Sequence, residues 1–215
     1  MKYFLPLVLA LTSTLQSCAQ ANQQENNTTK RVGGSCEGCE AIYESPIPLE
    51  QLSYTDTLPD YNNQGQKLHI SGTVYKPDGR TPARGVVLYI YHTDGTGVYP
   101  TLGDEKGWAR RHGYIRGWVR TNQKGEYAFY TLRPGAYPSR QAEEHIHITV
   151  KETGLNEYFI DEYVFADDPL LTKEHRQRMR NIGGSGVLNL QKSGKILIAK
   201  RDIVLGKNVA DYQLR

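Results

Sequence analysis

The residues with the clearest chemical potential are His145 and His147, two histidines separated by the β-branched Ile146. Side chains at positions i and i+2 of a β-strand point to the same face, so two imidazoles with this spacing can bind one metal ion from a rigid wall. Tyr99 and Tyr137, each of which follows a glycine turn, could add two phenolate oxygens. This set of four ligands is hard and anionic, and it suits ferric iron better than zinc.

The order of these residues along the chain is also informative. Arg116 and Gly117 form an Arg-Gly pair between the two tyrosines, and a Pro-Gly turn precedes Tyr137. With this order, the chain from about residue 68 to residue 165 resembles the intradiol ring-cleavage dioxygenases, which open catechols and protocatechuate with non-haem ferric iron. The resemblance implies Fe(3+) as the cofactor, and its ligands would be Tyr99, Tyr137, His145 and His147.

The resemblance also implies a reaction, in which a small catecholic substrate and dioxygen are the partners. Tyr99 corresponds to the ligand that is retained when substrate binds, and Tyr137 to the ligand that is displaced and acts as a base. The aromatic ring opens between its two hydroxyl-bearing carbons, and both atoms of dioxygen enter the product. Two phenolates and one hydroxide balance the charge of ferric iron, so the centre can lie in a low-dielectric cavity.

The chain departs from the family pattern at Ala142, where the family has an arginine whose cation stabilises the carbanion-like form of the substrate. Arg140 is the first candidate for the catalytic cation, with Arg116 and Arg120 as further candidates, because an anionic transition state in a water-poor pocket needs a positive partner. The alternative function is a β-sandwich binding module without catalysis, since residues 71–91 also resemble the opening of transthyretin-like and carboxypeptidase regulatory domains.

From about residue 66 onward, short runs rich in β-branched and aromatic residues alternate with Gly and Pro turns, which predicts an all-β fold. The expected strands are residues 67–75, 86–94, 114–121, 126–132, 145–151, 157–165, 186–190 and 195–206. The first and second of these, and the third and fourth, are expected to form hairpins. The fold would be an Ig-like or transthyretin-like β-sandwich of the intradiol type, with one short helix that begins at Pro169 and runs to about Asn181.

The amino terminus predicts export from the cytoplasm. Residues 1–17 read as a signal peptide, because Lys2 is followed by an apolar run that is too short to span a membrane. Leu-Gln-Ser then precedes Cys18 and resembles a lipobox, so Cys18 would carry a lipid anchor to a bacterial membrane, on the periplasmic or outer-membrane face. Ordinary secretory cleavage near Ala19 or Ala21 is the alternative, and it also predicts an extracytoplasmic protein.

The remaining chain is divided into a lipidated, partly disordered tether over residues 18–62 and an intradiol dioxygenase-like domain over residues 63–215. Cys36 and Cys39 are expected to form a local disulfide in an oxidising compartment, because a zinc site would need four such ligands. The formal net charge of +3 is too small to indicate a nucleic-acid-binding protein. A homo-oligomer is compatible with these features.

The other histidines carry weaker signals. His69, His112 and His175 are expected to lie at the surface. His92 ends the strand that leads to Tyr99, so we expect it to support the site as a hydrogen-bonding group or as a proton carrier.

Overall fold

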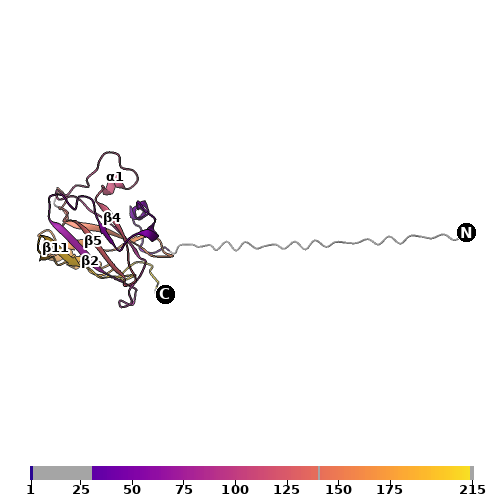
Figure 1. Cartoon of the computed structure of the whole chain (residues 1–215). Helices are drawn as coiled ribbons and strands as arrows, with labels where there is room; N and C mark the ends of the chain where they lie inside the picture. Colours follow the sequence, from indigo (N-terminus) through magenta and orange to yellow (C-terminus); the bar gives the residue numbers. More distant parts are fainter. Residues whose placement is uncertain (2–30, 140, 214–215) are drawn as a thin grey trace.

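Two six-stranded sheets form a sandwich in the computed structural model, which describes Met1, residues 31–139 and residues 141–213. The first sheet has the order β1-β5-β2-β11-β10, with β12 also paired to β2, and the second has the order β4-β3-β6-β8-β9, with β7 also paired to β6. The strands of the first sheet are β1 (Thr55–Thr57), β2 (Lys67–Tyr75), β5 (Glu126–Leu132), β10 (Gln191–Ser193), β11 (Ile196–Lys200) and β12 (Ile203–Val204). The strands of the second sheet are β3 (Val87–Tyr91), β4 (Arg116–Arg120), β6 (His145–Lys151), β7 (Tyr158–Phe159), β8 (Tyr163–Phe165) and β9 (Val187–Leu188). Figure 1 shows β2, β5 and β11 side by side in one layer of the folded body.

Apolar side chains fill the space between the sheets because they alternate along the strands. Ile70 of β2 and Phe129 of β5 meet Leu88 of β3 and Ile148 of β6 in one cluster, and none of these four is more than 2% exposed. Burial of one such side chain contributes roughly 1.5–3 kcal/mol. The predicted all-β sandwich is therefore confirmed.

A second, smaller apolar cluster lies on the opposite face of the second sheet, which we call the outer face. Ile42, from the 3₁₀ helix η1 (Cys39–Glu44), packs there with Tyr89 and Trp118. The indole Nε1 of Trp118 donates a hydrogen bond of 3.0 Å to the carbonyl of Ile42. The segment that contains η1 is therefore part of the fold, and it covers this outer face of the second sheet.

The folded part also begins upstream of residue 63, where the sequence-based boundary was placed. Val32 is 2% exposed and belongs to the main core. Strand β1 pairs in parallel with β5, and a second 3₁₀ helix, η2 (Leu49–Gln51), lies between η1 and β1. The local sequence of residues 31–62 did not reveal these contacts, because each is made with a distant part of the chain.

The two predicted hairpins were wrong, although their strands are present. Strand β2 pairs with β5, β11 and β12, whereas β3 pairs with β4 and β6, so each turn crosses from one sheet to the other. At this crossing, the Thr121 hydroxyl donates to the carbonyl of Ala83 and accepts from the backbone N–H of Val86. Turn residues specify that the chain reverses, but the choice between pairing and stacking depends on the core that both strands share.

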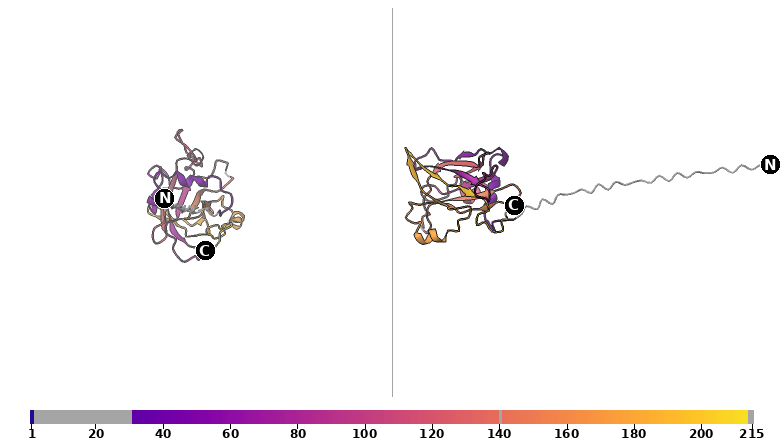
Figure 2. Two further views of the ribbon diagram at one scale, coloured as in Figure 1. Left: turned by 90° about the vertical axis from the view of Figure 1, so that its right-hand side faces the viewer. Right: turned by 90° about the horizontal axis from the view of Figure 1, so that it is seen from below.

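The helices are short. Helix α1 (Ala109–His112), which the sequence did not predict, lies beside the loop at the top of Figure 1. Helix α2 (Lys173–Arg178), orange at the edge of the body in Figure 2, begins after Thr172, whose side chain accepts the N–H of His175. The predicted start at Pro169 was wrong because the Asp168 carboxylate accepts the N–H of Leu170 and closes a turn there.

Two further features concern the covalent and membrane topology. The structure joins Cys36 and Cys39, so the predicted local disulfide is confirmed. Within the described residues, no helix has the length and apolar character needed to cross a lipid bilayer. Cys18 and the rest of residues 2–30 lie outside the described part, so the signal peptide and the lipid anchor stay predictions.

Candidate metal centre

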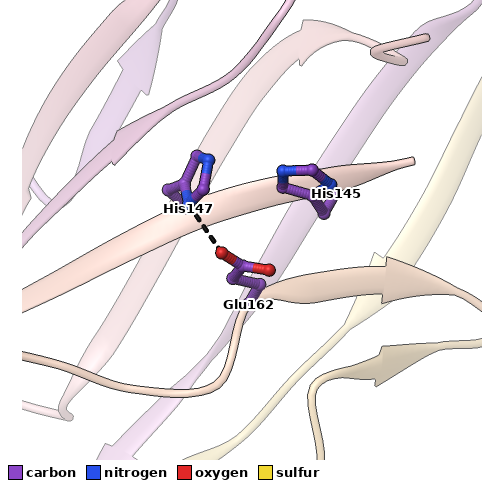
Figure 3. Close-up of side chains that lie close together, drawn as sticks. All are labelled: His145, His147 and Glu162. Atoms are coloured by element: carbon purple, nitrogen blue, oxygen red, sulfur yellow. Dashed lines mark ion pairs between the residues drawn. The ribbon is translucent and has the colours of Figure 1, made fainter. Parts of the chain in front are cut away.

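The two histidines of β6 lie on the outer face of the second sheet. In the antiparallel register, His147 is opposite Tyr91 of β3, and Tyr91 is opposite Arg116 of β4. Residues that are directly opposite share a face, so these three form one row across the sheet. Figure 3 shows His145 and His147 projecting from the same side of their strand. Ile146 points the other way into the core, so strand alternation separates the site from the sandwich interior.

The structure brings four potential ligand atoms together in this place. The phenolic oxygen of Tyr99 is 2.7 Å from Nε2 of His147 and 2.8 Å from the phenolic oxygen of Tyr137. The Tyr137 oxygen is 3.1 Å from Nε2 of His145. Atoms that each bind one metal ion at about 2 Å lie roughly 3 Å from their neighbours. Two phenol oxygens and two imidazole nitrogens therefore fit a single hard metal ion.

Both imidazoles are held with Nε2 directed at the tyrosines. His145 donates from Nδ1–H to the carbonyl of Glu143 at 2.7 Å, and His147 donates from Nδ1–H to Oε1 of Glu162 at 2.7 Å (Figure 3). A carbonyl oxygen can only accept, and the carboxylate accepts in the same way, so each ring keeps its proton on Nδ1. The lone pair of each Nε2 is thereby available to a metal ion.

Glu162 is an orienting residue that the sequence did not reveal. It precedes β8 and continues the register in which Ile146 is opposite Tyr163, so it lies opposite His147. Burial by itself would raise the pKa of the Glu162 carboxyl, but the hydrogen bond from His147 opposes this shift, and the pKa is lowered to about 2. The carboxylate is therefore ionised at neutral pH and strengthens His147 as a ligand.

A smaller cluster of His145, His147 and Glu162 could also hold an ion, since one ligand atom of each lies within 4.8 Å of the others. Glu162 contacts Nδ1 of His147, however, and the tyrosines contact Nε2 at the other edge of the same ring. The set with two tyrosines uses Nε2 of both histidines and leaves Glu162 in its orienting role. We therefore favour the four-residue set.

Two glycine turns that pack against each other position the tyrosines. Asp94 closes the first turn, because its Oδ1 accepts backbone N–H groups and its carbonyl accepts the N–H of Gly135 at 2.8 Å. Gly97 has a φ of +82°, and a Cβ placed on it would lie 1.9 Å from the carbonyl oxygen of Ala136. A Cβ on Gly135 would lie 2.6 Å from the carbonyl of Gly95. Only glycine permits this approach, which brings the following tyrosines together.

Both phenols of the centre carry their protons at neutral pH. Burial raises the pKa of Tyr99, and the hydrogen bond with Tyr137 raises it further. Burial also raises the pKa of Tyr137, although its contact with Tyr99 opposes the shift. A bound cation would have to displace these protons, and a highly charged ion lowers ligand proton affinity enough to do so.

As expected, His92 supports the site through hydrogen bonds, at the start of the loop that leads to Tyr99. It is not placed as a proton carrier. Its side chain is 1% exposed, and its ring nitrogens lie 2.7 Å from the Thr93 carbonyl and 2.7 Å from the Thr131 hydroxyl. Burial lowers the pKa of His92 to about 4, so the ring is neutral. Because both nitrogens are engaged, His92 ties the end of β3 to β5 and stabilises the loop that follows.

An aromatic stack covers the other side of His147. The Tyr91 ring stacks on His147 at 4.4 Å and on His112 at 3.7 Å between centroids. The expectation that His112 lies at the surface was wrong, because α1 folds it onto the outer face, where it is 5% exposed and 2.8 Å from the Tyr89 hydroxyl. Its burial lowers its pKa to about 4. This stack restricts the His147 ring.

The predicted catalytic arginines are placed differently from one another. Arg116 is on the outer face, but its guanidinium is 2.6 Å from the Glu44 carboxylate and lies over the Trp118 ring. Arg120 is opposite Val87 at the far end of β4. Arg140 lies outside the described residues. Within residues 31–139 and 141–213, no arginine is hydrogen-bonded to the two tyrosines or the two histidines.

The glutamates that precede His145 are both paired. Glu144 accepts from Nε of Arg133 at 2.6 Å, and Arg133 also binds Asp167. Glu143 is buried, and its carboxylate is 3.0 Å from Nδ1 of His175 on α2. His175 is therefore only partly exposed, and its contact with Glu143 joins α2 to the segment before His145. The basic and polar residues around His175 in the sequence did not indicate this contact.

A cavity of about 570 Å³ opens beside His147. Its walls are the outer face with Tyr91 and Glu162, the loop closed by the disulfide of Cys36 and Cys39, and helix α2 with the residues that follow it. Of the four candidate ligands, His147 alone lines this cavity, together with Glu162, which contacts the Nδ1 edge of its ring.

Comparison with known proteins identifies the family of the chain. A sequence model of the dioxygenase family matches residues 43–181. The chain is 25% identical over 130 residues to the protocatechuate 3,4-dioxygenase beta chain of Burkholderia cepacia, a match that spans 58% of this chain and 55% of that protein. It is 37% identical over 86 residues to catechol 1,2-dioxygenase 1 of Acinetobacter lwoffii, across 40% of this chain and 26% of that protein. The chain therefore spans about half or less of the length of these relatives.

Solved structures share the fold. The dioxygenase domain of a dioxygenase and carbohydrate-binding protein fusion from Streptomyces sp. SirexAA-E superposes with a TM-score of 0.54 at 23% identity, over 69% of this chain and 85% of that chain. Catechol 1,2-dioxygenase from Acinetobacter sp. ADP1 gives a TM-score of 0.55 at 17% identity, over 80% and 65% of the two chains. With most of its length matched by the family model and the same fold in these structures, the chain belongs to the intradiol dioxygenase family.

Proposed function

We propose that this protein is a non-haem ferric dioxygenase that opens a catecholic ring between its two hydroxyl-bearing carbons. The observation that carries the proposal is the convergence of two phenol oxygens and two imidazole Nε2 atoms at separations of 2.7–3.1 Å. This donor set suits Fe(3+), and family membership supports the reaction class. The ligands would be Tyr99, Tyr137, His145 and His147.

Ferric iron held by these residues would supply Lewis acidity that makes a bound catecholate reactive toward dioxygen. Residues of the chain itself would accept the substrate proton and keep the ligands oriented. Tyr137, held as a phenolate in the loaded site, would accept a proton from a catechol hydroxyl at its phenolic oxygen, and Tyr99 would remain a ligand. Glu162 and the Glu143 carbonyl keep the histidine rings oriented throughout, since both hold an Nδ1 proton. Elements η1 and α1 cover the part of the outer face around Tyr89 and Tyr91.

Iron content and the visible spectrum test the metal site directly. The mature chain, purified without chelator, should contain one iron per chain and show the visible absorption of ferric phenolates. Tyr99→Phe and Tyr137→Phe should weaken this band, and His145→Ala and His147→Ala should lower iron occupancy. Full iron and unchanged colour in all four variants would exclude this ligand set.

A metal-binding or ligand-binding module without turnover is the second candidate. The observation that favours it is Ala142 at the position of the family's arginine. Oxygen uptake separates the two candidates, because only the enzyme consumes dioxygen when a catechol is added. The substrates tested should include simple catechols, protocatechuate-like acids and larger catecholic compounds, and an iron-replete protein that is silent with all of them would be the non-catalytic module.

We further propose that the mature protein is extracytoplasmic and anchored to a bacterial membrane through a lipid on Cys18. The short apolar segment and the Leu-Gln-Ser before Cys18 support this. Mass spectrometry of the mature amino terminus is the test. An unmodified chain that begins at another residue would contradict the anchor.

A further inference from the structure

Arg201, in the link between β11 and β12, carries a buried positive charge that the proposed mechanism does not use. The residue is 4% exposed, and an arginine side chain keeps its proton in a protein. Among the described residues, Arg201 forms no ion pair, and its Nε atom has no hydrogen-bond partner. Burial of such a charge is costly, so the contacts that the guanidinium does make are informative about its role.

The guanidinium contacts the residues on both sides of Glu162. Its Nη1 donates to the carbonyl of Asp161 at 2.6 Å, and its central carbon lies 4.7 Å from the centroid of the Tyr163 ring. Tyr163 is fully buried in the main core, whereas the Glu162 side chain points to His147 (Figure 3). Because neighbouring side chains of an extended segment point to opposite faces, Arg201 lies on the core side of the segment that presents Glu162.

The same guanidinium reaches a second segment. Its Nη2 lies 3.4 Å from the carbonyl oxygens of Ile182 and Gly184. This second segment packs directly against the first, since the N–H of Asp161 donates to the carbonyl of Ile182 at 3.1 Å. A Cβ on Gly186 would lie 2.0 Å from the carbonyl oxygen of Glu162. Hydrogen bonds from a charged donor are stronger than neutral ones, so the guanidinium fastens both backbones at the place where Glu162 is attached.

We propose that Arg201 is a positioning residue that acts through Glu162. By fixing Asp161 and Tyr163, it holds the Glu162 carboxylate at Nδ1 of His147, where the two atoms are 2.7 Å apart. Arginine suits this role because its planar donors bind several carbonyls while its flat face packs on a ring. The expected effect on iron rests on the proposed function, whereas the hydrogen bond between Glu162 and His147 is a property of the chain itself.

Nuclear magnetic resonance tests the positioning without turnover. The mature chain is labelled with isotope-enriched histidine and freed of iron, and the Nδ1 protons of His145 and His147 are observed directly. In Arg201→Met, the His147 proton should exchange with solvent roughly 10-fold faster, the scale of one weakened hydrogen bond to a charged group. The His145 proton is the internal control, because its acceptor is the carbonyl of Glu143 and it should exchange as in the wild type.

A double-mutant cycle tests whether Arg201 acts through Glu162. Iron affinity is measured by competition with a chelator, and Arg201→Met should lower it roughly 3–5-fold when Glu162 is present. In a chain that already carries Glu162→Ala, the same substitution should have no further effect, since there is no carboxylate left to position. A residue that only stabilises the fold would lower iron affinity equally in both backgrounds.

Two variants separate positioning from loss of stability. Thr121→Val is the matched control, because it removes buried hydrogen bonds to Ala83 and Val86 beyond the far end of β4. It should lower the melting temperature and leave the His147 proton unchanged. Arg201→Lys keeps the charge and one donor for the Asp161 carbonyl, so its His147 proton should exchange at a rate between those of the wild type and Arg201→Met. If Arg201→Met does not fold, Arg201→Lys is decisive.

Wild-type exchange of the His147 proton in folded Arg201 variants would overturn the inference. Equal acceleration of the His145 and His147 protons, or the same acceleration in Thr121→Val, would also overturn it, because either result indicates general loosening. Additive losses of iron affinity in the cycle would have the same meaning. The proposed function fails separately, if the chain binds no iron or an iron-replete protein consumes no oxygen with any catechol, and proton exchange in the iron-free chain still gives its own answer.

Discussion

Removal of the Glu162 carboxylate should weaken iron binding without removing any ligand. Glu162→Ala leaves Nδ1–H of His147 without its acceptor at 2.7 Å, so the ring loses both its orientation and the charge that strengthens Nε2 as a ligand. A hydrogen bond to a charged group contributes roughly 1.5–3 kcal/mol. Because the Glu162 side chain is 42% exposed, solvent screening favours the lower end of this range. About 1.4 kcal/mol corresponds to a tenfold change, so iron affinity should fall about 10-fold.

The assay is competition between the protein and a chelator, followed through the visible phenolate band and through total iron. Glu162→Gln should fall between the wild type and Glu162→Ala, because the amide oxygen can still accept the hydrogen bond but carries no charge. Glu157→Gln is the matched control, since the Glu157 carboxylate accepts from the Tyr43 hydroxyl on the surface and does not touch either histidine.

Two results would refute this reasoning. Unchanged iron retention in Glu162→Ala would mean that the hydrogen bond to His147 does not matter for the metal. Complete loss of iron from Glu162→Ala, together with full iron in Tyr99→Phe and Tyr137→Phe, would mean that Glu162 is itself a ligand in the smaller cluster with His145 and His147.

Three further predictions concern the surroundings of the site. Gly97→Ala should destabilise the fold by about 2 kcal/mol or more, because φ is +82° and the new Cβ meets the Ala136 carbonyl; Gly79→Ala, with φ of +67° and open space around it, isolates the conformational cost in the same thermal melts. Joint replacement of Cys36 and Cys39 by serine should cost about 2 kcal/mol of stability, as expected for a short loop, and leave the iron content unchanged, so loss of iron would contradict the assignment. Arg140→Ala should lower turnover by roughly two to three powers of ten with iron and colour intact, because it removes one electrostatic donor, whereas Arg120→Ala at the far end of β4 should have little effect.

Local periodicity explains why much of the fold was predictable. The boundaries of β2, β5 and β6 match the predicted runs 67–75, 126–132 and 145–151, because alternation of apolar and polar residues is a property of consecutive positions. The placement of His145 and His147 on one face follows from the same period of two. The glycine turns before the tyrosines could also be recognised, since the first needs glycine for the positive φ of Gly97 and the second for the close backbone approach at Gly135.

The pairing of the strands depended on the tertiary structure. In each predicted hairpin, the two strands lie in different sheets and pack against each other across the core. Residues 31–62 are part of the fold through contacts with distant partners such as Asn156. A turn signal or the composition of a short segment contains no information about these non-local contacts.

The sequence alone determined the types and spacing of the candidate ligands, and hence the expectation of a hard ferric site. Only the tertiary structure decided how that site is supported: Glu162 lies at Nδ1 of His147, His112 is stacked beneath Tyr91, and Arg116 is paired with Glu44. The physical reason is that a ligand pattern is a local property of a strand, whereas hydrogen-bond partners, burial and charge balance arise only when distant segments pack together.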